Sequence, residues 1–98
     1  MKRLLLLAAL AAPGFADDAH TVIQKGRRFS VPEITIRRGD SLTFTNQDEF
    51  IHQIYAEGLF DSEERSPGQN LDETFPRTGT FEVHCHIHPK MKLVVHVD

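Results

Sequence analysis

Three side chains with metal-binding chemistry lie close together near the end of the sequence. Cys85, His88 and Met91 follow one another at the spacing Cys-x2-His-x2-Met. A thiolate, an imidazole and a thioether form a soft to borderline donor set, which favours copper over magnesium, calcium or manganese. Because two residues separate each donor from the next, one tight turn can present all three. We therefore predict a soft-metal site in this turn.

A copper site of the electron-transfer kind also needs a second histidine, because its plane holds two imidazoles and one thiolate beside a weak axial Met. His52 is the candidate. It has the same parity as apolar Ile54, and Cys85 has the same parity as Val83, so period-two alternation aims both donors inward. The predicted metal ligands are His52, Cys85, His88 and Met91.

The start of the sequence has the layout of a secretory signal peptide. A basic pair, Lys2-Arg3, precedes an apolar run over residues 4–12, and small residues follow. This is the order of a charged region, a short apolar region and a cleavage site. The apolar run is too short to span a bilayer. We predict a signal peptide over residues 1–16, export to the periplasm, and one copper-binding domain over residues 17–98 with no membrane insertion after cleavage.

The net charge and the single cysteine limit the functions that this protein could have. The 98 residues carry a formal net charge of −3, which becomes more negative by two when Lys2 and Arg3 are removed. No basic stripe is present, so binding to nucleic acid is disfavoured. An exported chain with a single cysteine cannot close an internal disulfide, and a free thiol is open to oxidation unless it is buried or ligated. We therefore prefer Cys85 as a metal ligand over a buried free thiol.

Short alternating segments separated by turn residues predict an all-β fold. There is no convincing amphipathic helix, and strands are predicted over 20–25, 33–37, 41–46, 51–57, 71–75, 80–85 and 92–97. Strands this short, with turns this frequent, are typical of a β-sandwich or barrel. In the irregular stretch before the fifth strand we predict a short helical turn around residues 61–65.

The ligand spacing and several framework motifs resemble the cupredoxins. Within that family the chain is most similar to the plastocyanin, pseudoazurin and amicyanin group, with the short amicyanin-type ligand loop between His88 and Met91. The resemblance covers residues 29–97. Further similar elements are Arg38-Gly39-Asp40, Leu59-Phe60-Asp61-Ser62, Thr74-Phe75 and Gly79-Thr80-Phe81.

This resemblance implies a Greek-key β-sandwich of about seven to eight strands with its metal site at one end. It implies one type 1 copper per chain, Cu(I) or Cu(II), held by His52, Cys85, His88 and Met91. Asn46 would tie the His52 turn to the cysteine loop, and the edge of the His88 ring would reach the surface. The implied function is a monomeric one-electron carrier, not an enzyme. Its implied partners are redox proteins, such as an amine dehydrogenase and a c-type cytochrome.

Two other functions stay open. A copper chaperone or storage protein would hold labile Cu(I), but one of the two methionines is Met1, inside the predicted signal peptide. An oligomeric copper enzyme would use His84 or His86 for a second metal, as the Cys-His pairs of multicopper oxidases and copper nitrite reductases do. We prefer surface roles for both histidines, because inward ligands and outward neighbours alternate here.

Two smaller alternatives concern the same region. Zinc could occupy Cys85, His52 and His88 in a tetrahedral site. The apolar residues near the site either form a docking face around His88 or pack the loops against each other. These residues are Phe50, Ile87 and Pro89.

Overall fold

The computed structural model of this protein describes residues 20–98, and the predicted signal peptide lies outside these residues. Eight strands make up the described part: β1 (Thr21–Gln24), β2 (Glu33–Ile36), β3 (Ser41–Asn46), β4 (Ile54–Ala56), β5 (Phe60–Asp61), β6 (Asn70–Thr74), β7 (Gly79–Cys85) and β8 (Lys92–Val97). Within residues 20–98, no helix has the length and apolar character needed to cross a membrane.

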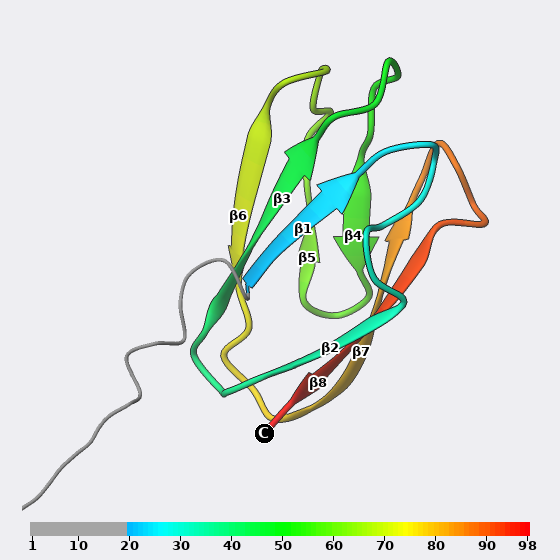
Figure 1. Cartoon of the computed structure of the whole chain (residues 1–98). Helices are drawn as coiled ribbons and strands as arrows, with labels where there is room; N and C mark the ends of the chain where they lie inside the picture. Colours follow the sequence, from blue (N-terminus) through cyan, green and yellow to red (C-terminus); the bar gives the residue numbers. More distant parts are fainter. Residues whose placement is uncertain (1–19) are drawn as a thin grey trace, which may run out of the picture.

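The strands form the two layers of a β-sandwich (Figure 1). One sheet has the order β1-β3-β6, and the other has the order β2-β8-β7-β4-β5. Two pairs are parallel, β1 with β3 and β2 with β8, while the remaining pairs are antiparallel. The predicted all-β sandwich is confirmed.

Alternation along the strands builds the core between the sheets. In β3 and β8 every second side chain is buried, as a strand with one face on a core requires. The ring of Phe44 from one sheet lies 6.4 Å from the ring of Phe60 in the other, and Phe60 contacts Phe75 edge to face at 6.0 Å. Burial of these large apolar side chains holds the two layers together.

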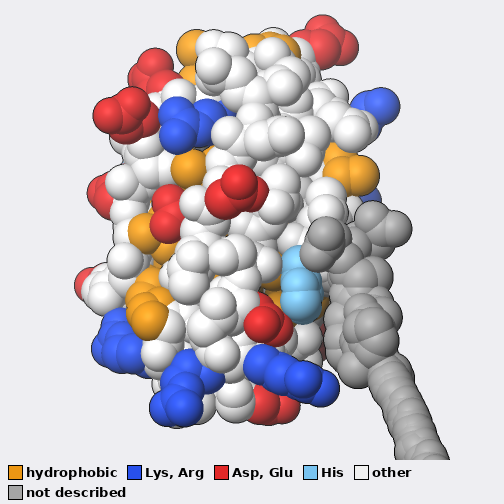
Figure 2. Space-filling model, turned by 90° about the vertical axis from the view of Figure 1, so that its left-hand side faces the viewer, with side chains coloured by type: hydrophobic (Ala, Val, Ile, Leu, Met, Phe, Trp, Pro, Cys, Tyr) orange, Lys and Arg blue, Asp and Glu red, His pale blue; other side chains and the backbone are white. Residues whose placement is uncertain are grey.

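The surface seen in Figure 2 carries interspersed positive and negative side chains with small, separate hydrophobic patches. Hydrophobic atoms also appear at its upper end, which is the loop end of the sandwich in Figure 1. This face shows no broad field of one sign, in keeping with the absence of a basic stripe in the sequence.

The predicted strand at 51–57 is too long, because β4 begins only at Ile54. His52 instead pairs with Arg65 in an isolated bridge, with backbone N···O distances of 3.0 and 2.7 Å. The predicted helical turn at 61–65 is also wrong. The backbone N–H groups of Ser62 and Arg65 donate to the carbonyl oxygens of Ile54 and His52, so they are not available for hydrogen bonds within a helical turn.

The strand register brings three loops to one end of the sandwich. Gln24 pairs with Asn46, so the loops that follow β1 and β3 leave together. Cys85 pairs with Ile54, so the loop before β4 and the loop after β7 meet at the same end. These are the loops over residues 25–32, 47–53 and 86–91; in Figure 1 the loop over 47–53 lies at the top, and the loop over 25–32 begins near that end before it runs down to β2.

Candidate metal centre

Cys85 and His52 meet inside the sandwich, although 33 positions separate them in the chain. Cys85 is the last residue of β7, opposite Ile54 of β4, and His52 comes two residues before Ile54. Their exposed fractions are 2% and 1%, and His52 Nδ1 lies 3.5 Å from Cys85 Sγ. The inward orientation predicted for both side chains is confirmed. Among the described residues, His52 is the only hydrogen-bonding neighbour of this sulfur.

The other ring nitrogen of His52 is held by a buried carboxylate. His52 Nε2 lies 2.8 Å from Asp48 Oδ2. A carboxylate accepts hydrogen bonds, so Nε2 carries a proton, and Nδ1 is the ring nitrogen that faces Cys85. An imidazole fixed in this way is ready to bind a metal through Nδ1.

Asp48 is itself anchored by a distant turn. The backbone N–H groups of Gly26 and Arg27 donate to its two oxygens at 2.7 and 2.8 Å. Both residues have positive φ, 66° and 58°, and this lets consecutive N–H groups point at one carboxylate. Burial raises the pKa of Asp48, but the hydrogen bonds from Arg27, His52 and Gly26 outweigh it, and the pKa is lowered below 3.8. The carboxylate is therefore charged near neutral pH.

Asn46 braces the loop that carries His52. Its amide nitrogen donates to the carbonyl oxygens of Phe50 at 2.8 Å and Arg65 at 2.9 Å. These bonds do not reach the cysteine loop, so the implied role of Asn46 needs correction. The link between the two loops is a backbone bond of 2.8 Å from His86 N–H to the Gln53 carbonyl.

His88 lies beside His52 in the turn after β7. The two rings meet edge to face with centroids 5.1 Å apart, and Phe50 contacts His88 at 5.9 Å. Burial lowers the pKa of His88, and the neighbouring charges of His52 and Arg27 lower it further against the opposing charge of Asp48. The ring is thus neutral near pH 7, the form that binds metals.

One atom of His88 gives a direct test of whether a metal fits. Within residues 20–98, His88 Nε2 is buried and has no hydrogen-bond partner. A buried polar nitrogen without a partner is costly, and a metal ion is one group that would satisfy it. The residues present therefore fit a metal at this position.

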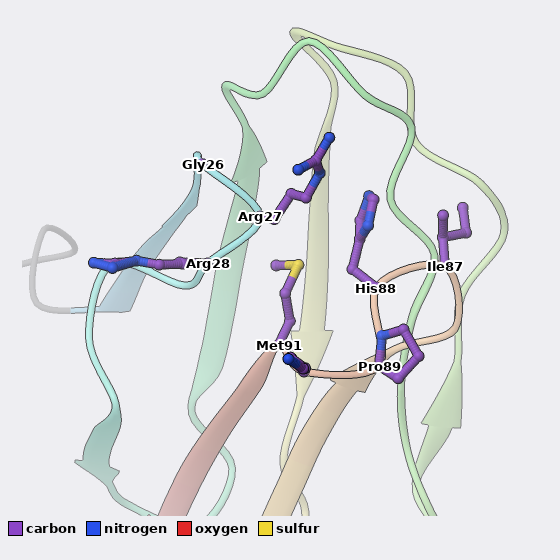
Figure 3. Close-up of a pocket in the computed structure, with 8 residues that line it drawn as sticks. Gly26, Arg27, Arg28, Ile87, His88, Pro89 and Met91 are labelled. Carbon is purple, nitrogen blue, oxygen red and sulfur yellow. The ribbon is translucent and has the colours of Figure 1, made fainter.

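Met91 completes the turn. Its N–H donates to the His88 carbonyl at 2.9 Å, and its side chain is 2% exposed. Figure 3 shows the Met91 thioether and the His88 ring pointing in the same direction, toward the end of the molecule where Arg27 lies. His52, Cys85 and Met91 are in positions suitable for a type 1 copper site, with His88 adjacent.

The candidate ligands lie near one another, but their donor atoms do not converge on one point. In the part of the chain that the structure describes, no three His, Cys, Asp or Glu side chains converge as a complete metal site. This holds for the cluster around Cys85, which relies on Met91 as well, and for the histidines on the outside of β7.

His84 of β7 and His86, the residue directly after that strand, face away from the core, as alternation predicts. His86 stacks on Tyr55 with ring centroids 4.1 Å apart, and its Nε2 is 3.0 Å from an oxygen of Asp61. His84 is 3.0 Å from Glu82. Each ring thus has a carboxylate partner, and the described residues around them provide no set of three donors for a second metal.

Sequence reasoning did not find Asp48 as part of the site. The available signal was its position four residues before His52 in one polar turn, a spacing that suits a side-chain hydrogen bond. Nothing in the sequence pointed to the turn at Gly26 and Arg27, because its contact with Asp48 spans more than 20 residues.

Known proteins resemble this chain in both sequence and structure. Amicyanin from Paracoccus denitrificans is 29% identical over 94 residues, covering 90% of this chain and 72% of amicyanin. The structure of a reduced amicyanin mutant matches with a TM-score of 0.76 and 28% identity over 90% of each chain. A purple cupredoxin from Nitrosopumilus maritimus matches with a TM-score of 0.74 over 80% of this chain and 98% of that one, at 22% identity. No protein-family profile matches the sequence.

The sandwich, the buried Cys-His pair and the similarity to amicyanin lead to one class. The fold is that of the cupredoxins, and the similarity to amicyanin supports a blue copper protein.

Proposed function

We propose that the protein is a type 1 copper protein that carries single electrons between redox proteins in the periplasm. The observation that carries this proposal is the fixed His52 ring, with Nε2 on Asp48 and Nδ1 3.5 Å from the Cys85 sulfur. The proposed ligands are His52, Cys85, His88 and Met91. The similarity to amicyanin supports the carrier role over that of an enzyme.

The chain's own residues explain why this site suits electron transfer. Bound copper supplies a one-electron couple between Cu(I) and Cu(II). The Cys85 thiolate and Met91 thioether suit Cu(I), while the imidazoles of His52 and His88 suit both states. Paired strands, buried side chains and the Asp48 carboxylate hold the donors, so they need little rearrangement when the charge changes.

The location and partners of the protein are part of the same proposal. The layout of residues 1–16 supports export to the periplasm, and the relative amicyanin supports a pairing with redox proteins. We propose that the domain over residues 17–98 acts as a monomer with one copper.

Optical and EPR spectra of the Cu(II)-loaded protein test the function. We expect strong visible absorption from a Cu–thiolate bond, one copper per chain and a reversible reduction in voltammetry. Cys85→Ala should abolish the colour. A colourless wild type at stoichiometric Cu(II) would rule out the carrier. A bound Cu(I) without a reversible couple would instead support a chaperone or storage protein.

A further inference from the structure

A positively charged groove runs beside the candidate metal centre, between the loop after β1 and the turn after β7. Its cationic side chains come from both segments and from the first residue of β8, and no Asp or Glu of the described residues lines it. We call this surface the basic groove; its charged residues are Arg27, Arg28, Lys90 and Lys92. The charge is local, because the whole chain has a formal net charge of −3.

Exposed apolar side chains adjoin the basic groove around His88. Ile87 and Val31 line the groove and are 43% and 36% exposed, and Phe50 is 40% exposed. The guanidinium of Arg27 lies 4.3 Å from the centre of the Phe50 ring, so charge and apolar surface are joined in one patch. Figure 3 shows Arg27, Ile87 and His88 around the same opening.

A protein that exchanges electrons at His88 must approach this patch. Apolar contacts permit close approach without buried unpaired charges, while charges at the rim steer and orient the encounter. A partner with positive rim charges would be repelled by Arg28, Lys90 and Lys92. A partner with carboxylates there would be attracted.

We propose that the basic groove docks a redox protein whose own docking surface carries carboxylates around an apolar centre. This inference rests on the proposed function, because it takes His88 as the point of electron exchange. It adds the charge of the partner, which the ligand set alone does not specify.

Oxidation of the copper-loaded protein by charged probes tests the inference. One electron passes from the Cu(I) protein to hexacyanoferrate(III), which becomes hexacyanoferrate(II). The double variant Arg28→Gln/Lys92→Gln removes two charges from the groove and leaves Arg27, whose amide holds Asp48, unchanged. The matched control, Arg37→Gln/Arg38→Gln, removes two charges beside the C-terminal end of β8, away from the groove.

We expect the groove variant to lower the rate with hexacyanoferrate(III) about five-fold at low ionic strength, since local charge raises encounter rates by ten-fold or more. The control should change the rate less than about two-fold, and about 1 M salt should remove the difference through screening. With the cationic oxidant tris(phenanthroline)cobalt(III), the groove variant should react faster. Equal responses of the groove and control variants would overturn the inference.

A second measurement uses a macromolecular probe. Poly-L-glutamate added to the 15N-labelled Cu(I) protein should shift amide signals in residues 26–31 and 87–92. Shifts confined to other surfaces would overturn the inference, as would stronger binding of these residues to phosphatidylglycerol vesicles. If the wild type shows the visible absorption and reversible couple but not these responses, only the docking inference fails. If it lacks that absorption, the proposed function itself fails.

Discussion

Two pairs of histidines surround Cys85, and they differ in environment more than in chemistry. His52 and His88 lie at the loop end of the sandwich, next to the sulfur and to each other. His84 and His86 lie one residue on either side of Cys85, yet they face away from it and stack near Tyr55. Proximity to Cys85 in the sequence therefore does not distinguish the proposed metal ligands from the outer histidines.

A hydrogen-bonded carboxylate does not distinguish the inner histidines from the outer ones either. The Nε2 atoms of His52, His84 and His86 each lie within 3.0 Å of a carboxylate oxygen. What differs is burial: the side chain of Asp48 is 6% exposed, whereas that of Asp61 is 64% exposed. A buried carboxylate fixes the ring because water cannot replace it, while an exposed pair contributes little. The comparison favours the inner histidines as the proposed ligands, because a buried carboxylate holds the His52 ring and His88 has a buried ring nitrogen without a partner.

The largest effect should come from exchanging one histidine of each pair for alanine. His52→Ala removes a proposed ligand and should abolish the blue absorption at stoichiometric Cu(II). His86→Ala should leave absorption and copper content unchanged. Visible spectra measure the absorption of the two variants, and metal analysis measures their copper content. Loss of colour in His86→Ala would show that the outer pair takes part in the site.

Removing the carboxylate behind each ring should give a smaller effect. Asp48→Ala should weaken copper binding about 10- to 100-fold, the usual effect of losing such an outer partner, and shift the reduction potential. Asp48→Asn keeps an acceptor for His52 Nε2 and should recover part of the affinity. Asp61→Ala is the matched control and should change neither quantity. Competition with a chelator and voltammetry measure both, and equal affinity of Asp48→Ala and wild type would contradict the positioning role.

The pH dependence of the metal-free protein should reflect the lowered pKa of His88. Below pH 6.5 the unfolded chain binds a proton at this position more readily than the native state does. The native state is therefore progressively destabilised as the pH falls below that value. His88→Gln should remove this part of the slope, and the control His86→Gln should retain it. Urea unfolding at several pH values measures the slope, and an unchanged slope in His88→Gln would contradict the burial of the neutral ring.

The smallest effect is expected for the outer pair as a whole. The double variant His84→Gln/His86→Gln should change the free energy of unfolding by no more than about 0.5 kcal/mol, as is usual for surface positions. It should also bind one copper, like wild type. A fall from two metal ions to one, measured by metal analysis of both proteins, would instead support a second metal site on this face.

Much of the fold follows from local patterns. Alternation in β3 and β8 predicts both strands to within a residue, because each presents one face to the core. The short strand β5 was not predicted, since two residues provide no period. Its pairing with β4 depends on the return of the chain through Leu59 and on the contacts of Phe60 in the core.

The candidate metal site also has features that follow from the sequence and features that depend on the tertiary structure. The sequence by itself determined the donor types, their spacing from Cys85 to Met91, and the inward parity of His52, because these depend only on residue identity and period. Only the tertiary structure decided which nitrogen of His52 faces the sulfur. That choice depends on Asp48 and on two N–H groups of a turn more than 20 residues away. Hydrogen bonds between distant segments leave no local pattern, so they become visible only once the strands are paired.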